Sequence, residues 1–376
     1  MNVLEGIRVL DLSQNMAGPY CTQILGDLGA DVLKIEPPGG DPARDWGPPF
    51  WGDTGALFMS TNRNKRSAVL DLKTREGRET LWTLVEQADV FVQTLRPGAI
   101  ERLGFSEHAV RERRPEVVYV SVSAYGDSGP GSDLAGYDPL IQAYSGLMAN
   151  TGAPDGPPAR AGASVIDLGT GMWGAVGVLA ALRRRDQTGE GSHVQLALLD
   201  TALGFMSYHL TGYLASGVSP ERCGTSLALI CPYQAFPTSD GELMIAGAND
   251  GIFRRLCAAL DLDELGSDAR FADNPSRVRH CGVLVSALTE RTSGHSTAAL
   301  FALLREHGVP CAPIHTIPEV VQDGQVKATG MLRSVPLEGV EGYVDTAMPV
   351  RWDGARPEPG ATPPGIAEHG PRFETD

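Results

Sequence analysis

The sequence predicts an α/β protein with two parts, a larger one built on a parallel sheet and a smaller α+β unit. In the larger part, short apolar runs alternate with helical segments, which is the pattern of strands joined by crossover helices. The length of 376 residues is more than one hydrophobic core usually serves. With 20% charged and 42% apolar residues, the composition is that of an ordinary globular protein.

The strands expected in the larger part are short runs of apolar and β-branched residues. They are residues 6–12, 30–36, 67–72, 88–94, 117–123 and 193–199. Helices are expected after the loop SQNMAGP, as far as Gly29, and over residues 76–87. Because strands alternate with helices, both faces of the sheet should be covered, and ligands should bind at the carboxyl ends of the strands.

Basic residues follow several of these expected strands. They are Lys34, the run NRNKR at 62–66, Lys73, Arg96 and Arg102. Each one alone is typical of a solvated surface charge. Gathered on one rim of the sheet, they would instead form a site for an anion, and the turn Arg96-Pro97-Gly98 suits a guanidinium directed at a phosphate.

The remaining segments predict the domain organisation. Residues 124–167 are rich in Gly, Pro, Ser and Asp but also in apolar residues, so we expect an ordered connection that delivers residues to a site beside Asp167. The expected division is a large domain at 1–199, a linker at 200–222, a small domain at 223–318 and a return to the large domain at 319–376. The tail has no apolar periodicity after residue 353, so it is expected to lie over another surface.

The stretch SVIDLGTGMWGAVGVLAALRRR, residues 164–185, combines one acidic residue, Asp167, with a long apolar segment. Apolar residues recur at helical spacing on several faces of this segment, which predicts a buried helix. Arg183, Arg184 and Arg185 suit the negative end of such a helix, and Thr188-Gly189 gives a stop. The helix is therefore expected to begin at or near Asp167.

Two interpretations of Asp167 are open on this stretch alone. The carboxylate is either an N-cap that accepts a backbone N–H, or a nucleophile kept ionised by free N–H groups and the helix dipole. As a nucleophile it would carry an acyl or phosphoryl group covalently, with Gly169, Gly171 and Gly174 letting a substrate approach the backbone. The same glycines fit G-x-G-x-x-G, but the acidic residue after the next strand, Asp200, lies too far along the chain for a dinucleotide site.

Charge and cysteine usage exclude several classes of protein. The net charge of −15 argues against nucleic-acid and anionic-membrane partners. The six cysteines form no C-x-x-C pair, so neither a disulfide framework nor a metal site is expected. No signal-peptide core stands at the N-terminus, and the longest apolar run, near 175–182, is too short to span a bilayer. A cytoplasmic location is therefore expected.

Six segments, in order along nearly the whole chain, carry a resemblance to a known family. They are VLDLSQNMAGPYCTQILGDLGADVLKIE, NRNKRSAVLDLKT, RPGAIERLGF, GYDP, SVIDLGTGM with its continuation AALRRRDQTGEG, and HGVPCAPIHTIPEV. Together they resemble the class III CoA-transferases, also called the CaiB/BaiF or formyl-CoA transferase family. The resemblance implies a Rossmann-like, CoA-binding large domain and an interlocked, ring-like homodimer with the site at the subunit interface.

The resemblance also implies a reaction in which Asp167 is the nucleophile. The carboxylate attacks an acyl-CoA thioester and gives a mixed anhydride and free CoA thiolate. The thiolate attacks the anhydride and leaves CoA on Asp167 as a thioester. An acceptor carboxylate attacks this aspartyl-CoA thioester, and the released thiolate carries off the new acyl group. CoA and acyl-CoA are substrates here, and no permanently bound cofactor is expected.

The family's CoA contacts match particular positions of this chain. By resemblance, CoA would be bound by Met16, Ala17, Leu70, Lys73, Thr94, Leu95, Arg96, Arg102 and Tyr137. Among these, Lys73 and Arg102 would hold phosphates, and Leu70 and Leu95 would flank the adenine or the pantetheine arm. No metal ligand is expected.

Two alternatives to CoA transfer stay open. The family includes α-methylacyl-CoA racemases, which use a histidine together with the aspartate, but this chain has Tyr137 at the histidine position, and a phenol of ordinary pKa is a poor base at neutral pH. The other alternative is a homologue that binds acyl-CoA without catalysis. Formyl-CoA transferase carries a tetraglycine segment in its small domain, and this chain has none between Cys223 and Asp250, so formate and oxalate are not expected to be the specific pair. Nothing in the sequence identifies the donor or the acceptor acid.

Overall fold

The computed structural model describes residues 2–358 and 360–374 and divides the chain into two compact units. The first unit comprises Met1–Leu147, Arg160–Val218 and Gly324–Asp376, and the second comprises Met148–Ala159 and Ser219–Asp323. Most of the expected linker at 200–222 therefore groups with the first unit. Residues 148–159, expected in the large domain, group with the second.

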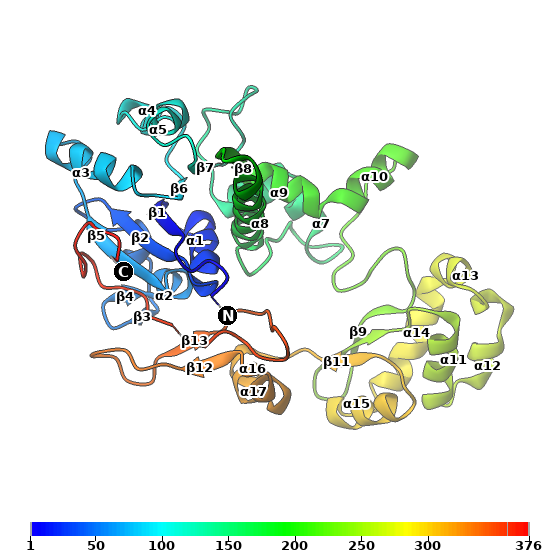
Figure 1. Ribbon diagram of the computed structural model, residues 1–376. Helices are drawn as coiled ribbons and strands as arrows, with labels where there is room; N and C mark the ends of the chain where they lie inside the picture. The colour runs from blue at the N-terminus through cyan, green and yellow to red at the C-terminus, as the bar shows by residue number, and fades with distance from the viewer. Residues whose placement is uncertain (1, 359, 375–376) are drawn as a thin grey trace. The chain divides into compact units, whose positions relative to one another are not determined.

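The first unit is built on a six-stranded sheet whose neighbouring strands are all parallel (Figure 1). Its strands are β1 (Arg8–Leu12), β2 (Asp31–Glu36), β5 (Lys65–Val69), β6 (Val90–Gln93), β7 (Val118–Ser123) and β8 (Ser192–Ala197). They lie in the order β5-β2-β1-β6-β7-β8. The order reverses between β1 and β6, and such a switch point is where open parallel sheets bind their ligands.

All six expected strands are present, with ends displaced by up to three residues. β5 begins at Lys65, two residues before the expected start at Ser67, and ends at Val69, three residues before the expected end. β8 ends at Ala197, where the chain turns into helix α9 (Leu198–Phe205). Apolar composition could not show this last boundary, since strand and helix are both apolar there.

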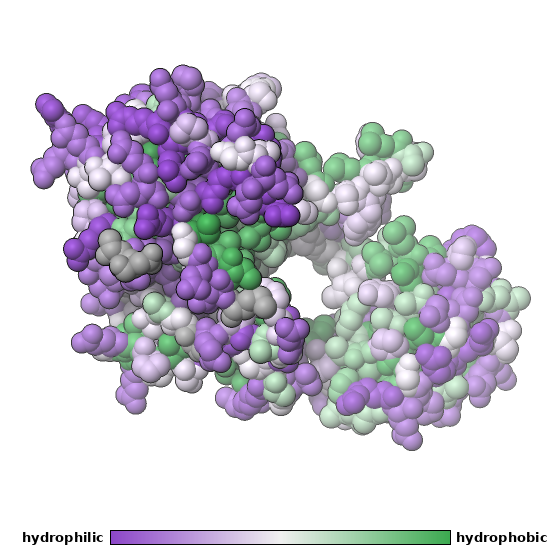
Figure 2. Space-filling view, viewed as in Figure 1, coloured by the Kyte–Doolittle hydropathy of each residue, from purple (hydrophilic) through white to green (hydrophobic). Residues whose placement is uncertain are grey.

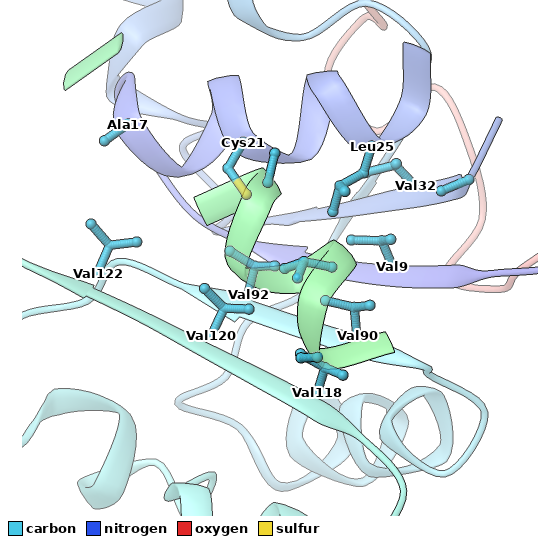
Figure 3. Close-up of a cluster of buried hydrophobic side chains, with 14 of the residues drawn as sticks. Val9, Ala17, Cys21, Leu25, Val32, Val90, Val92, Val118, Val120 and Val122 are labelled. Carbon is cyan, nitrogen blue, oxygen red and sulfur yellow. The ribbon is translucent and has the colours of Figure 1, made fainter. Parts of the chain in front are cut away.

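Helices cover both faces of the sheet. On one face lie α1 (Ala17–Asp27) and α8 (Val165–Thr188), and on the other lie α3 (Arg75–Val85), α4 (Ala99–Arg102) and α5 (Glu107–Arg113) (Figure 1). Successive side chains of each strand point to opposite faces of the sheet, so the core consists of two clusters, one on each face. Figure 3 shows the first face, where Cys21 and Leu25 of α1 pack with valines of the strands such as Val92 and Val120.

Helix α8 was expected to be buried and to begin near Asp167, and the structure confirms the long helix. It begins at Val165, so that Asp167 is its third residue, and it ends at Thr188, followed by Gly189 with the left-handed φ of 74° favoured by glycine. Its length and composition alone would allow it to cross a membrane, unlike the short apolar run considered in the sequence. One side of the helix packs against α1 and the sheet, whereas Met172, Trp173 and Val176 are 48%, 56% and 53% exposed, so the expected burial on all faces is wrong.

Shorter elements complete the first unit. They are β3 (Phe50–Trp51), β4 (Thr54–Gly55), β12 (Leu332–Ser334), β13 (Val344–Thr346), the 3-10 helix Pro42–Asp45, α2 (Ala56–Thr61), α6 (Asp138–Tyr144), α7 (Leu147–Asn150), which continues into the second unit, α10 (Ser207–Ser216) and α17 (Gly324–Thr329). The helix α6 lies inside the long connection 124–167, which is thus ordered as expected.

The C-terminal tail lies along β5, the edge strand of the sheet. The N–H of Asn64 donates to the carbonyl of Ala361, and the N–H of His369 donates to the carbonyl of Ser67. The side chain of Phe373, only 3% exposed, is buried in the core beneath α3. The tail therefore covers the open edge, as the lack of apolar periodicity after residue 353 had suggested.

The second unit has a core of its own around a three-stranded antiparallel sheet, as an α+β unit should. Its elements are β9 (Tyr233–Pro237), β10 (Glu242–Ala246), β11 (Cys311–Pro313), α11 (Asp250–Ala259), α12 (Asp263–Ser267), the 3-10 helix Ala269–Phe271, α13 (Asn274–Arg279), α14 (Cys281–Thr292), α15 (Thr297–Glu306) and α16 (Ile317–Gln322). A disulfide joins Cys231 to Cys281. The sequence did not predict it, because two cysteines separated by 50 residues form no recognisable spacing.

Candidate functional site

A cavity of about 310 Å³ opens at the switch point between β1 and β6. The loop after β1 contributes Met16 and Ala17, and the loop after β6 contributes Thr94, Leu95 and Arg96. Tyr137 and Asp167 complete the set of predicted residues in its wall. Segments far apart in sequence thus bring seven of the ten predicted site residues around one cavity.

A second cavity, of about 510 Å³, lies at the same end of the sheet, where the carboxyl ends of β2 and β5 are found. Leu70 and Lys73 line it, and the side chain of Lys73 makes no hydrogen bond or ion pair with any residue that the structure describes. Gln14 and Leu95 line both cavities, so the two are neighbours across these side chains. Arg102 lines neither cavity and lies instead at the end of the short helix α4 beside Gly98.

Asp167 is held at the start of α8 by another carboxylate. The N-cap residue, Ser164, makes no side-chain capping hydrogen bond. In its place, Oδ2 of Asp138 accepts hydrogen bonds from the N–H of Ile166 at 2.8 Å and from the N–H of Asp167 at 3.2 Å. The N–H of Leu168 donates to the carbonyl of Ser164. Asp167 is therefore not the cap of its helix, and the cap comes from α6.

The ionisation of Asp167 differs from the sequence-based expectation. Burial, together with the nearby negative charge of Asp138, raises the pKa of Asp167 from 3.8 to about 7. We expected free N–H groups at the helix start to keep the carboxylate ionised. That expectation was wrong, because the N–H groups of Ile166 and Asp167 are already hydrogen-bonded to Asp138.

The glycines of α8 serve helix packing. A Cβ atom on Gly171 would lie 2.7 Å from the backbone oxygen of Ala17, and one on Gly174 would lie 2.9 Å from Sγ of Cys21. A Cβ atom on Gly169 would meet the ring of Phe205 on α9. The expectation that these glycines let a substrate approach the backbone was therefore wrong, since neighbouring helices already occupy that space.

Most of the basic residues that follow the strands do not form an anion site either. Lys34 is fully buried and ion-paired with Asp41 at 2.8 Å, and Lys65 is fully buried and ion-paired with Asp11 at 3.1 Å. Arg63 and Arg66 likewise pair with Asp27 and Asp31. Of the basic residues considered, Lys73 and Arg96 line the two cavities.

These buried charges hold the loop between β1 and α1. Nζ of Lys34 donates to the carbonyl of Ser13 at 2.7 Å, and Oδ1 of Asp41 accepts from the N–H of Asn15 at 3.1 Å. The N–H of Gln14 donates to Oγ1 of Thr94 at 2.9 Å, and Asp11 accepts from both the N–H and the hydroxyl of Ser13. Because Gln14 to Ala17 line the cavity beside Asp167, this network fixes part of its wall.

Sequence reasoning missed two parts of this site. The cavity is also lined by Trp46, whose ring makes an edge contact with Tyr137 at a centroid distance of 6.1 Å. Asp138 was noticed only as part of the GYDP turn, and its contact with α8 depends on the tertiary fold. Among the described residues, no histidine lines the cavity, and no group of three or more His, Cys, Asp or Glu side chains could hold a metal ion.

The chain is similar over most of its length to known CoA-transferases. The model of CoA-transferase family III matches residues 4–370. The succinate–glutarate CoA-transferase of Agrobacterium fabrum is 39% identical, over 91% of this chain and 86% of the relative. The succinyl-CoA:mesaconate CoA-transferase of Haloarcula hispanica is 37% identical, over 98% and 95%. The acetyl-CoA:oxalate CoA-transferase of Acetobacter aceti is also 37% identical, over 87% and 85%.

The fold has a solved counterpart. A CaiB/BaiF family protein from Brucella suis superposes with a TM-score of 0.87 and is 38% identical, with 98% of this chain and 97% of the other covered. The similarity therefore extends over both units of the chain.

Proposed function

The chain belongs to CoA-transferase family III and is a CoA-transferase, and we propose that it moves CoA from an acyl-CoA thioester to a carboxylic acid through covalent intermediates on Asp167. The observation that carries this proposal is the place of Asp167, in the wall of a cavity at the switch point of the sheet. Its pKa of about 7 makes the carboxylate more basic than an ordinary aspartate, while a substantial fraction stays ionised at neutral pH.

The proposed reaction passes through two kinds of intermediate. The Asp167 carboxylate attacks the thioester carbonyl, the C–S bond breaks, and an acyl-aspartyl anhydride and CoA thiolate result. The thiolate attacks the aspartyl carbonyl of the anhydride, which releases the donor acid and leaves an aspartyl-CoA thioester. The acceptor carboxylate then attacks this thioester, and the thiolate released attacks the acceptor acyl carbonyl of the new anhydride. Asp167 returns as a free carboxylate, and one thioester has replaced another.

The two neighbouring cavities suit one extended CoA molecule. We place the nucleotide end of CoA in the cavity that Leu70 and Lys73 line. The ammonium group of Lys73 has no partner among the described residues and is suited to bind a phosphate. The pantetheine arm would pass Leu95, which lines both cavities, and bring the thioester to Asp167. Met16, Ala17, Thr94 and Tyr137 would contact the arm or the acyl group, while Arg102, which lies outside both cavities, is the weakest of the proposed contacts.

We propose a dicarboxylic acid as the acceptor. The relatives described above are named for succinate, glutarate, mesaconate and oxalate, which all carry two carboxylates. When one carboxylate is bonded to Asp167, the other needs a counter-charge inside the cavity. Among the described lining residues Arg96 is the only cation, and its guanidinium is suited to pair with the second carboxylate of such a substrate.

The α-methylacyl-CoA racemase alternative is less well supported. A racemase needs a second base on the opposite face of the α-carbon, and among the described residues no histidine lines the cavity with Asp167. Tyr137 stands in that wall, and a phenol is a poor base at neutral pH.

We also propose an interlocked homodimer, as the family resemblance implies. Helix α10 has no buried residue, and Figure 2 shows apolar side chains gathered over it. Its exposed apolar residues include Tyr208, Leu210, Tyr213 and Leu214, the last with 80% of its surface exposed. An exposed apolar surface of this kind is typical of an interface.

Trapping with hydroxylamine tests the proposed function. The protein is incubated with a panel of acyl-CoA donors, quenched with hydroxylamine, digested and analysed by mass spectrometry, with D167N as the matched control. A hydroxamate at Asp167 in the wild type and none in D167N is the expected result. An unmodified Asp167 with every donor, in protein that binds CoA, would contradict the covalent mechanism. Exchange of the α-proton in deuterated water without an acceptor acid would instead support the racemase.

A further inference from the structure

The start of α8 is capped from outside its own segment. The usual capping position belongs to Ser164, whose side chain makes no capping hydrogen bond. Oδ2 of Asp138 accepts instead from the N–H groups of the second and third helical residues, Ile166 and Asp167. One of the two N–H groups that Asp138 binds is thus the backbone N–H of the proposed nucleophile.

Asp138 is itself rigidly held. It is 1% exposed and begins α6, with Pro139 in the first turn of that helix. Its other carboxylate oxygen accepts a hydrogen bond from Nε2 of Gln142, and Oε1 of Gln142 accepts from the N–H of Ala161 at 2.9 Å. The segment just before α8 is therefore tied to the same side chains that support Asp138.

From this geometry we propose that Asp138 is a positioning residue for Asp167: its carboxylate fixes the backbone of the nucleophile and places a fixed negative charge beside it. This inference rests on the proposed function, in which Asp167 attacks the thioester. A neutral oxygen such as that of asparagine could accept from the same N–H groups, so the charge of Asp138 is not needed for capping and can be tested separately from it.

The charge of Asp138 acts on the ionisation of Asp167. Burial is the largest cause of the raised pKa of Asp167, and the charge of Asp138 is the second. Arg96 and Tyr137 line the cavity with this carboxylate, and the helices packed against α8 also carry titratable groups, namely Tyr20, Cys21 and Asp27 of α1, Tyr144 of α6 and Asp200 of α9. None of these groups contributes to the shift. Removing the charge at position 138 should therefore lower the pKa of Asp167 without changing the composition of the cavity wall.

Three variants separate the charge from the hydrogen bonds. D138N keeps an oxygen for the two N–H groups and removes the charge, whereas D138A removes both. S164A is the matched control, because Ser164 holds the formal cap position without making the capping bond. For each variant, the rate of acyl-aspartate formation is measured against pH in a single turnover, by hydroxylamine trapping, together with the dissociation constant of CoA.

The expected result is a split between the variants. D138N should shift the acid limb of the pH profile down by about one unit. D138A should lose rate by roughly 100-fold at its pH optimum, as expected for a misplaced nucleophile, and D138N should recover most of that loss. CoA affinity should stay unchanged in all variants, and S164A should match the wild type.

An acid limb that stays in place in D138N, with Asp167 still trapped, would overturn the inference and leave the proposed function intact. Absence of any hydroxamate in the wild type would instead defeat the proposed function. In D138N the new NH₂ group faces the donor Nε2 of Gln142, so folding is checked by thermal unfolding. Should the variant not fold, a carboxyl ¹³C titration of the wild type decides. A pKa of Asp167 near 7, with the Asp138 resonance shifting over the same pH range, supports the inference. A pKa of Asp167 below 5, with no such shift of the Asp138 resonance, overturns it.

Discussion

The ammonium of Lys34 and the carboxylate of Asp41 lie 2.8 Å apart with neither side chain exposed to solvent. Both also bind the backbone of the loop after β1, at Ser13 and at Asn15. The nearby carboxylates of Asp41 and Asp11 raise the pKa of Lys34 against the opposing effect of burial, so the lysine stays charged. This ion pair links the stability of the sheet to the shape of the cavity wall.

Breaking this pair from one side should be costly. K34M leaves the carboxylate of Asp41 buried without its cation, and we expect it to lower the free energy of unfolding by roughly 3–5 kcal/mol. The double variant K34M/D41L should lose less than the sum of the two single changes. Urea unfolding of the wild type, K34M, D41L and K34M/D41L measures this coupling. R75A, which breaks the exposed pair Arg75–Glu79, serves as the control and should have no measurable effect. Additive losses would show that the pair is not coupled.

The rate of acyl transfer to Asp167 should rise with pH through neutrality. A carboxylate must be ionised to attack, and the pKa of Asp167 is about 7. At pH 5 only about 1% of the enzyme would carry the ionised form, so the single-turnover rate should be about 100-fold below its plateau. Single-turnover reactions, stopped with hydroxylamine after increasing times, measure this rate between pH 5 and 9. A rate that is flat down to pH 5 would mean that burial does not raise this pKa.

The same carboxylate should destabilise the fold at high pH. Its pKa is about 7 in the folded protein and near 3.8 when unfolded, so folding favours the protonated form. The penalty is absent below pH 3.8, grows as the pH rises towards 7, and is complete above 7. D167N should therefore be more stable than the wild type at pH 8, by at most about 4 kcal/mol, and the difference should shrink towards pH 4. Thermal unfolding at several pH values tests this, and a difference that does not depend on pH would contradict it.

The contact between α1 and α8 should not tolerate a methyl group at Gly171. A Cβ atom there would lie 2.7 Å from the backbone oxygen of Ala17, which cannot move without moving α1. We expect G171A to lower the free energy of unfolding by roughly 1–3 kcal/mol and to weaken CoA binding, because Ala17 lines the cavity. G204A is the control, since nothing lies within 4 Å of a Cβ atom on that glycine of α9. Equal effects of the two changes would refute this packing argument.

The tail should contribute to the stability of the sheet. F373A empties a core position that is 3% exposed, and we expect a loss of roughly 3–5 kcal/mol together with faster aggregation, as the edge of β5 becomes open. F373L keeps most of the volume and should lose much less. Light scattering and chemical unfolding report the two effects. An unchanged stability in F373A would mean that the tail is not anchored at this position.

The sequence was most informative where local composition decides the structure. The strands of the sheet are apolar runs bounded by turns, and the helix after Asp167 has a clear apolar pattern and a glycine stop, so both were predicted. Lys34 and Lys65 read as surface charges, because nothing local shows that Asp41 and Asp11 meet them inside the fold.

The site shows the same division between local and tertiary information. Asp167 was singled out from its own segment, and the resemblance to a family named the residues of both strand-end loops that line the cavity with it. The cap from Asp138 could not be predicted, because it depends on α6 packing against α8. The ionisation of Asp167 was misjudged as a direct result, since the helix-end N–H groups assumed to be free are already bonded.

The tail that pairs with β5 also constrains the order in which the protein can mature on the ribosome. β5 ends at Val69, whereas its covering segment begins near Ala361. At a synthesis rate of about 5–20 residues per second, the nascent chain waits roughly 15–60 s before this segment exists. During that interval the edge of the sheet is open to other chains.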